Sequence, residues 1–227
     1  MKQKFTILFD LDGTLVDTAP DLMLAHNHVM KKFGYPTKST EDIRNLVGKG
    51  AGALIGRSIW GQAKKEFSKV LDEKIKDEMV KEFVNFYGKN IVNESTLITG
   101  VKDFLIWCKE QNISMAVCTN KQEHLSNDLL KKIGIYDFFE YVAGSDTFDY
   151  CKPDPRHLTN VVEILDGDLK KTIMIGDSET DANAGKAAEI PVILLENGYT
   201  EKNTTEIYHN HLIKDFTGIE KIIKKYL

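Results

Sequence analysis

The feature that most constrains this chain is a short apolar run near its start that ends in two acidic residues. Residues 5–9 read FTILF, and Asp10, Leu11, Asp12 and Gly13 follow them. A run of this length is enough for a strand buried on both faces but too short for a helix. Because alternate residues of an extended chain point the same way, Asp10 and Asp12 should leave the strand on one side, and Gly13 then permits a sharp turn.

Two carboxylates at one strand end are unfavourable by themselves, because like charges repel and the pKa of one of them rises. The pair Asp10 and Asp12 therefore predicts a bound cation, or a division of work between a nucleophile and a general acid. The alternative is a strand that ends in a polar turn, which an Asp-Gly pair alone is enough to suggest.

Polar residues also follow three later elements of the sequence. Two of these elements are apolar runs typical of buried strands, residues 113–118 (ISMAVC) and 172–175 (TIMI). The third is a loop in which a lysine precedes prolines that open a helix. The residues of interest at these places are Thr119, Asn120, Lys121, Lys152, Gly176, Asp177, Ser178 and Asp181. Ser178 and Asp181 also fit a capping box, which needs no chemistry. Each signal alone is weak, but their common place at strand ends or loops favours one shared site.

Together these residues resemble the four motifs of the haloacid dehalogenase superfamily of phosphohydrolases. The first motif matches residues 10–14 (DLDGT), the second Thr119, the third Lys152, and the fourth Gly176-Asp177 with Asp181. Residues 17–22 (DTAPDL) and 47–51 (VGKGA) are similar to the phosphoglycolate phosphatase branch of that superfamily. The resemblance covers nearly the whole chain.

The order of hydrophobic patterns predicts an α/β protein with a helical insertion. From about residue 92 onward, helical and strand patterns alternate, which predicts a doubly wound parallel sheet, a Rossmann-like core with ligands at the carboxyl ends of its strands. No strand-like run interrupts residues 17–91, so we expect an inserted all-helical cap domain there. The α/β catalytic core then comprises residues 1–16 and 92–227.

The helices of the cap carry recognisable start and stop signals. Thr18 and Asp21 fit a capping box, and the helix that follows is expected to end at Gly34. An apolar stripe over residues 67–86 predicts one long helix, or two in succession, closed by Gly88.

The resemblance implies a role for each residue at the strand ends. Asp10 is expected to be the nucleophile that forms an aspartyl-phosphate, and Asp12 the acid that protonates the leaving alkoxide and then the base that activates water. Lys152 would neutralise the phosphoryl group, while Thr119 and Asn120 would contact its oxygens. The dehalogenases that gave the superfamily its name lack an acid at the position of Asp12, so its presence favours phosphoryl transfer.

Mg²⁺ is the expected cofactor. Asp10 and Asp177 offer hard oxygen ligands, which suit an octahedral Mg²⁺ shell. The resemblance adds the backbone carbonyl of Asp12 as a further ligand, and Asp181 either as a ligand or as a support for the ligands.

The cap is expected to select the substrate. The loop of Gly48, Lys49 and Gly50 could bring backbone N–H groups to a small anionic leaving group, and Lys49 and Arg57 are candidate cations for it. The alternatives are that the loop is only a turn that starts a helix and that Arg57 is an exposed helix charge. Lys121 likewise either contacts phosphate or begins the next helix.

These assignments predict a Mg²⁺-dependent phosphatase that hydrolyses a small phosphate monoester, with 2-phosphoglycolate as the expected substrate. One alternative is a sugar phosphatase, or a phosphomutase similar to β-phosphoglucomutase, which would pass the phosphoryl group to a sugar hydroxyl. Another is a non-catalytic binding protein on the same scaffold, which is disfavoured because every expected catalytic position is filled.

Composition argues against several other classes of protein. The net charge of −4 comes from interspersed acidic and basic residues, so we expect no nucleic-acid partner. No apolar stretch reaches the length of a membrane span, and Asp10 interrupts the first apolar run before it could act as a signal peptide. The three cysteines form no C-x-x-C pair. We therefore expect a cytoplasmic monomer or homodimer that acts on a small phosphorylated metabolite and not on a membrane.

Overall fold

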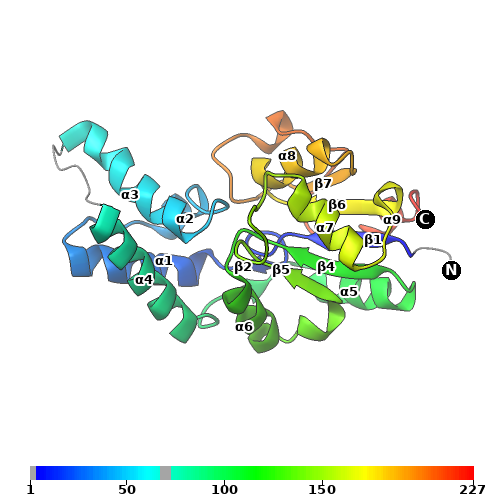
Figure 1. The fold of residues 1–227 in the computed structure, drawn as a ribbon, viewed down its shortest axis with the longest axis horizontal. Helices are drawn as coiled ribbons and strands as arrows, with labels where there is room; N and C mark the ends of the chain where they lie inside the picture. Colours follow the sequence, from blue (N-terminus) through cyan, green and yellow to red (C-terminus); the bar gives the residue numbers. More distant parts are fainter. Residues whose placement is uncertain (1–3, 67–72) are drawn as a thin grey trace.

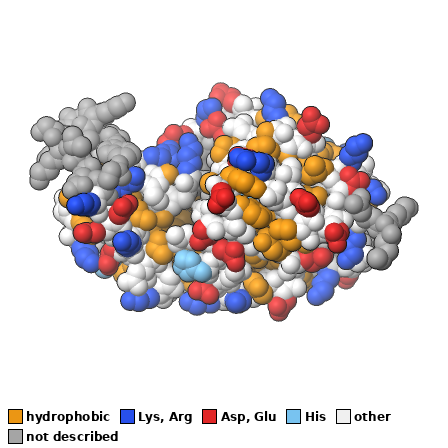
Figure 2. Space-filling model, in the orientation of Figure 1, with side chains coloured by type: hydrophobic (Ala, Val, Ile, Leu, Met, Phe, Trp, Pro, Cys, Tyr) orange, Lys and Arg blue, Asp and Glu red, His pale blue; other side chains and the backbone are white. Residues whose placement is uncertain are grey.

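The computed structural model describes residues 4–66 and 73–227, which form two lobes (Figure 1). One lobe is built on a six-stranded sheet with helices packed against it, and the other is helical. In the described part of the chain, no helix combines the length and the apolar character needed to cross a membrane. Figure 2 shows acidic and basic side chains interspersed over this face of both lobes.

The sheet has the strand order β5-β4-β1-β6-β7-β8, and every neighbouring pair is parallel. Its strands are β1 (Thr6–Phe9), β4 (Ser114–Cys118), β5 (Tyr141–Ala143), β6 (Thr172–Gly176), β7 (Val192–Leu195) and β8 (His211–Ile213). β1, β4 and β6 are buried throughout, which explains their continuous apolar runs. The predicted parallel sheet is confirmed. The sequence did not reveal β8, because its three residues are only half-buried and form no apolar run.

Each face of the sheet packs against its own helices. In β1, Ile7 and Phe9 belong to one hydrophobic core and Leu8 to another, as expected for a strand buried on both faces. The first core includes apolar residues of α5 (Val101–Glu110), α6 (Glu123–Ile133) and α9 (Glu220–Ile223), and the second those of α7 (Arg156–Ile164) and α8 (Glu179–Ala187). Short 3₁₀ turns lie at Tyr136–Phe138, Leu169–Lys171 and Thr204–Glu206.

The helical lobe is inserted between two short strands that pair with each other. It contains α1 (Ala19–Phe33), α2 (Thr40–Arg44), α3 (Ala51–Glu66) and α4 (Glu73–Lys89). The chain leaves the core through β2 (Val16–Asp17) and returns through β3 (Thr96–Leu97), and the two strands are antiparallel. This pairing supports the division that we propose, a core of residues 1–16 and 92–227 and a cap of residues 17–91.

Of two helix ends predicted in the cap, one is observed and the other is not. α1 ends at Gly34, which adopts the left-handed conformation, as predicted. Gly88 does not end α4, which runs on to Lys89; a side chain at Gly88 would approach Leu125 of α6 to 3.3 Å, so the glycine allows close packing. The part of the predicted helix on residues 67–72 lies outside the described residues.

The capping box expected at Thr18 and Asp21 is not formed. Thr18 Oγ1 donates instead to Asp12 Oδ1 at 2.7 Å. The Asp21 carboxylate accepts from the backbone N–H groups of residues 93–95 and from Ser95 Oγ at 2.6–3.1 Å. Donors distant in the sequence therefore replace the local cap, and Asp21 ties α1 to the segment that returns to the core.

Candidate active site

Three carboxylates meet at the carboxyl end of the sheet. Asp10 follows β1, while Asp177 and Asp181 lie where β6 gives way to α8. β1 and β6 are neighbours, with Phe9 opposite Ile175, so the register places Asp10 beside Asp177. One oxygen from each of the three carboxylates lies within 4.8 Å of the other two, and all three residues are buried. The structure thus brings these three candidate metal ligands together.

Lys152 neutralises part of this charge. Its Nζ lies 2.8 Å from Asp10 Oδ1 and 2.5 Å from Asp181 Oδ1, and the residue is 3% exposed. Burial alone would lower the pKa of Lys152, but the two carboxylates outweigh it and the pKa is raised. The lysine therefore stays protonated, and three carboxylates against one ammonium leave two net negative charges.

Burial makes the remaining negative charge unfavourable. It raises the pKa of Asp10 from 3.8 to about 6, although Lys152 opposes the rise. The pKa of Asp177 is raised well above its ordinary value by burial and by repulsion from Asp10 and Asp181. A divalent cation with a preference for oxygen ligands would relieve this repulsion, so the donor set fits Mg²⁺.

Asp181 divides its two oxygens between two tasks. Oδ1 accepts from Lys152, whereas Oδ2 accepts from the N–H groups of Asp177 and Ser178 at 3.1–3.2 Å and from Ser178 Oγ at 2.8 Å. The contacts of Oδ2 hold the first turn of α8 against the end of β6. Asp181 therefore supports the helix start and lies in the carboxylate cluster at the same time.

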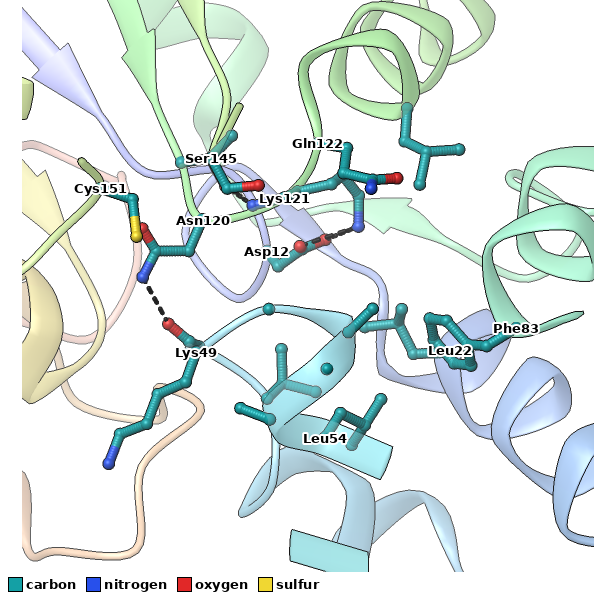
Figure 3. Close-up of a pocket in the computed structure, with 18 of the residues that line it drawn as sticks. Asp12, Leu22, Lys49, Leu54, Phe83, Asn120, Lys121, Gln122, Ser145 and Cys151 are labelled. Atoms are coloured by element: carbon teal, nitrogen blue, oxygen red, sulfur yellow. Dashed lines mark hydrogen bonds and ion pairs between the residues drawn. The ribbon is translucent and has the colours of Figure 1, made fainter. Parts of the chain in front are cut away.

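Asp12 lies beside this cluster in an ion pair of its own. Its two oxygens are 2.8 and 2.9 Å from Lys121 Nζ (Figure 3). Lys121 Nζ also lies 4.5 Å from the centroid of the Tyr87 ring, which belongs to cap helix α4. The sequence suggested that Lys121 either contacts phosphate or begins the next helix. In the structure its side chain pairs with Asp12, and α6 begins at Glu123. The place of Lys121 directly after β4, two residues beyond Thr119, was the available signal.

Thr119 and Asn120 continue β4 into the interface between core and cap. Both are buried, and Asn120 Nδ2 donates to the carbonyl oxygens of Gly48 at 3.1 Å and Lys152 at 2.9 Å. One side chain therefore joins the cap loop to the third motif. Gly50 has a φ of +82°, and a side chain there would approach the Asn120 carbonyl to 3.2 Å, so the loop requires glycine at this point.

A cavity of about 280 Å³ separates Asp12 from the helices of the cap (Figure 3). Lys49 lines it, but the Lys49 side chain points away from Asp12. The core side of the cavity is formed by Asp10, Asp12, residues 119–122, Leu125, Ser145 and Cys151, and the cap side by residues 47–54, Leu22, Val80, Phe83 and Tyr87. The wall opposite Asp12 is thus mainly apolar.

The structure does not bring Arg57 to this cavity. The Arg57 guanidinium donates to the carbonyl oxygens of Asn45 and Leu46 at 3.1–3.2 Å and pairs with Glu201 of the core. Its donors thus hold the turn that precedes the glycine-rich loop and link cap to core. The expectation that Arg57 binds the substrate is not supported by these contacts.

Comparison with known proteins identifies the family. A sequence model of the haloacid dehalogenase-like hydrolases matches residues 7–195. The chain belongs to the haloacid dehalogenase-like hydrolases. The phosphoglycolate phosphatase of Mesorhizobium japonicum is 36% identical over 213 residues, covering 94% of this chain and 92% of that protein. That of Caulobacter vibrioides is 37% identical over 216 residues, covering 95% of this chain and 89% of that protein.

A solved structure with a similar fold supports the same family assignment. The crystal structure of a predicted phosphoglycolate phosphatase from Haemophilus somnus matches with a TM-score of 0.90 and 31% identity, covering 98% of this chain and 99% of that chain. The resemblance inferred from the four motifs, and the fold class of a doubly wound parallel sheet, are both confirmed.

The residue of this hydrolase that sequence reasoning missed most clearly is Tyr199. Its N–H donates to Asp177 Oδ2 at 2.6 Å, and its hydroxyl donates to Asp17 Oδ1 at 2.5 Å. The same hydroxyl accepts from the N–H of Ala19, the first residue of α1, at 2.8 Å. Tyr199 therefore links a candidate metal ligand to the strand by which the chain enters the cap. Gly198, where a side chain would overlap the Asp177 backbone, was the available signal.

Proposed function

We propose that this chain is a Mg²⁺-dependent phosphatase that hydrolyses a small phosphate monoester through an aspartyl-phosphate intermediate. The observation that carries the proposal is the position of Asp10, which pairs with the ammonium of Lys152, belongs to the carboxylate cluster with Asp177 and Asp181, and lines the same cavity as Asp12. The relatives named phosphoglycolate phosphatases support the same activity.

Asp10 is the proposed nucleophile. A pKa of about 6 leaves its carboxylate ionised at neutral pH, and Lys152 holds Oδ1, which frees the other oxygen for attack on phosphorus. The bond from phosphorus to the ester oxygen then breaks, and Asp12, which must first take up a proton from solvent, gives that proton to the departing alkoxide. Asp12 next removes a proton from the water that cleaves the aspartyl-phosphate, which restores Asp10 and releases phosphate.

The residues that would hold Mg²⁺ are Asp10, Asp177 and the backbone carbonyl of Asp12, with Asp181 as a ligand or a support. The ion, when bound, supplies positive charge that lets an anionic nucleophile approach an anionic phosphoryl group. Thr119 and Asn120 stand at the cavity end of β4, where they would contact the phosphoryl oxygens, and Lys152 would balance their charge.

The substrate that we propose is 2-phosphoglycolate. The relatives carry that name, and the cavity of about 280 Å³ beside Asp12 suits a small leaving group. The backbone of Gly48, Lys49 and Gly50 lines this cavity and would contact the part of the substrate that faces the cap. Cys108, Cys118 and Cys151 are free thiols, which supports a reducing, cytoplasmic location.

Release of inorganic phosphate from a panel of esters tests this proposal. The panel comprises 2-phosphoglycolate, ethyl phosphate, glucose 6-phosphate and β-glucose 1-phosphate, each with Mg²⁺ and with EDTA. We expect 2-phosphoglycolate to give the highest kcat/KM and EDTA to abolish release from every ester. Faster release from a sugar phosphate would contradict the proposed substrate. Conversion of β-glucose 1-phosphate to glucose 6-phosphate without release would favour the phosphomutase, and no reaction at all would favour a binding protein.

A further inference from the structure

The cavity beside Asp12 contains an ammonium group to which the proposed chemistry gives no task. Lys121 lies within it, 8% exposed, with Nζ at 2.8 and 2.9 Å from the two Asp12 oxygens. Leu22, Leu54 and Phe83 of the cap line the same cavity. Charges attract more strongly in such apolar surroundings than in water, so an anionic group that entered this cavity would interact strongly with Lys121.

Tyr87 adds a hydrogen-bond donor at the same place. Tyr87 is fully buried, lines the cavity, and holds its ring 4.5 Å from Lys121 Nζ. Its hydroxyl has no hydrogen-bond partner within the described ranges 4–66 and 73–227. Leaving a buried donor unsatisfied costs about 1–3 kcal/mol, and an acceptor on a bound molecule would remove that cost. The ring also stabilises the ammonium in its position by a cation–π contact.

The distances place Lys121 within reach of a leaving group that carries a carboxylate. To protonate the ester oxygen, Asp12 must approach it to about 2.6–3.2 Å, and Lys121 Nζ lies 2.8 Å from Asp12 Oδ2. In 2-phosphoglycolate one methylene separates the ester oxygen from the carboxylate, so with bonds of about 1.5 Å the two groups are neighbours. An ammonium beside Asp12 can therefore contact the carboxylate while Asp12 contacts the ester oxygen.

The other cations expected at this place are directed elsewhere. Arg57 pairs with Glu201 and with backbone carbonyl groups of the cap. Among the described residues that line the cavity, the cations are Lys49 and Lys121, and Lys49 points away from Asp12 (Figure 3).

We propose that Lys121 and Tyr87 form the subsite for the carboxylate of the leaving group, and that Lys121 thereby sets the preference for esters with an anionic leaving group. This inference rests on the proposed phosphatase function and assigns its substrate selection to particular side chains. The ammonium that recognises the carboxylate then comes from Lys121, in the loop that follows β4 of the core. The cap contributes the aromatic ring and the hydroxyl of Tyr87.

The test compares 2-phosphoglycolate with ethyl phosphate, an alkyl ester that also needs a proton on its leaving group but lacks the carboxylate. Lys121→Met removes the charge and keeps the length, whereas Lys121→Arg keeps a charge. We expect Lys121→Met to lower kcat/KM for 2-phosphoglycolate by roughly ten- to a hundred-fold more than for ethyl phosphate, mainly through KM. Lys121→Arg should retain most of the preference, and Tyr87→Phe should reduce it less than Lys121→Met. Lys132→Met, at an exposed lysine of α6, is the matched control.

A binding measurement separates recognition from chemistry. 3-Phosphonopropionate replaces the ester oxygen of 2-phosphoglycolate with a methylene and cannot be hydrolysed, and propylphosphonate lacks its carboxylate. The wild type should be inhibited more strongly by 3-phosphonopropionate, and Lys121→Met should remove this difference between the two inhibition constants.

The outcomes separate this inference from the proposed function. If Lys121→Met slows both esters equally and leaves the ratio of inhibition constants unchanged, Lys121 only positions Asp12 and the subsite is overturned. If the wild type shows no preference for 2-phosphoglycolate over ethyl phosphate, the proposed substrate and the subsite fail together, while phosphatase activity stands. Should Lys121→Met fail to fold, Tyr87→Phe decides: an unchanged preference overturns the subsite.

Discussion

Asp10 illustrates how opposing forces could prepare a single residue for the role that we propose for it. Burial favours the protonated acid, but the Lys152 ammonium, 2.8 Å away, favours the carboxylate, and the resulting pKa of about 6 lies below neutral pH. A carboxylate that is ionised yet poorly solvated is a better nucleophile than one in water. The proposed action of Asp10 as a nucleophile therefore depends on its negative charge.

Replacing Asp10 with Asn should abolish phosphate release without unfolding the protein. The amide keeps the size of the side chain but removes the attacking charge, and it also removes repulsion from Asp177 and Asp181. Phosphate release would be measured together with the melting temperature and circular dichroism. Substantial turnover by a folded Asp10→Asn protein would assign the nucleophile to another residue.

Asp177→Asn should separate the metal response from stability. In EDTA, the variant should melt at a higher temperature than the wild type, because burial and repulsion from Asp10 and Asp181 make an ionisable carboxyl group unfavourable at this position. The rise in melting temperature that Mg²⁺ gives the wild type should disappear, since a charged ligand is lost. Ser178→Ala, which removes a neighbouring hydroxyl but no carboxylate, should keep the Mg²⁺ response. An Asp177→Asn protein that Mg²⁺ stabilises as well as the wild type would remove this residue from the metal site.

The sequence allowed us to predict the residues that directly follow a strand. It did not allow us to predict residues whose contacts are with parts of the chain distant in sequence. Asp10, Thr119 and Asp177 each follow an apolar run, so their common position could be inferred from the chain. The pairing of Lys121 with Asp12 joins residues 109 positions apart, and no local pattern encodes such a distance. Tyr199 reaches Asp177 through its backbone N–H, which any residue possesses and no motif reveals.

Between secondary-structure elements, an ion pair attaches helix α2 to β2, the strand by which the chain enters the cap. Arg44 of α2 donates to both oxygens of Asp17 in β2 at 2.7–2.9 Å and lies 5.4 Å from the centre of the Tyr199 ring. Burial would raise the pKa of Asp17, but the hydrogen bonds from Arg44 and Tyr199 outweigh it and the pKa is lowered. The orientation of α2 is thereby connected to the segment that holds Asp177.

Arg57→Met should weaken the cap without changing which ester is preferred. The substitution removes two hydrogen bonds to the turn before the glycine-rich loop, and we expect a loss of about 1–2 kcal/mol in the free energy of unfolding. Glu201→Gln removes only the exposed partner and should cost less than about 1 kcal/mol. Urea unfolding gives the stabilities, and kcat/KM for 2-phosphoglycolate and ethyl phosphate gives the preference. A selective loss with 2-phosphoglycolate in Arg57→Met would restore Arg57 as a substrate-binding residue.

Elements were predictable where local signals agreed with tertiary contacts. The helix that ends at Gly34 and the strands that carry the motifs fall in this class, because period and end signals coincide. Thr18 and Asp21 did not form their capping box, since Thr18 donates to Asp12 and Asp21 accepts from residues 93–95 instead. β8 is short and half-buried, so its edge position depends on β7 rather than on its own sequence.

For the whole molecule, a buried histidine should make stability depend on pH. His157 of α7 is fully buried, and burial together with the nearby Lys152 charge lowers its pKa from 6.5 to about 4. The unfolded chain therefore binds a proton at a higher pH than the folded one. The contribution of His157 is complete above pH 6.5 and is lost as the pH falls toward 4.

Urea unfolding of the wild type and His157→Gln, both in EDTA, checks this expectation. Between pH 7.5 and pH 5, the wild type should lose roughly 2 kcal/mol more of its free energy of unfolding than the variant. Comparison with the variant cancels the titration of the other groups. Equal losses in the two proteins would mean that His157 titrates normally in the folded state.

The overall architecture followed from the sequence because β/α alternation admits few arrangements. Parallel strands buried on both faces need helices on each side, and their carboxyl ends then share one edge. The relation between the lobes was not predictable in the same way. It depends on single contacts such as Asn120 with Gly48 and Arg57 with Glu201, which join surfaces that no sequence pattern pairs.

The antiparallel pairing of β2 with β3 has a consequence for how this fold can diversify. Asp17 lies opposite Thr96, so the chain departs and returns at adjacent points on one ladder. The length and content of the intervening segment can change without shifting the register of the six-stranded sheet. Gene segments encoding other insertions could therefore be exchanged at this joint during evolution, giving new substrate ranges to an unchanged catalytic edge.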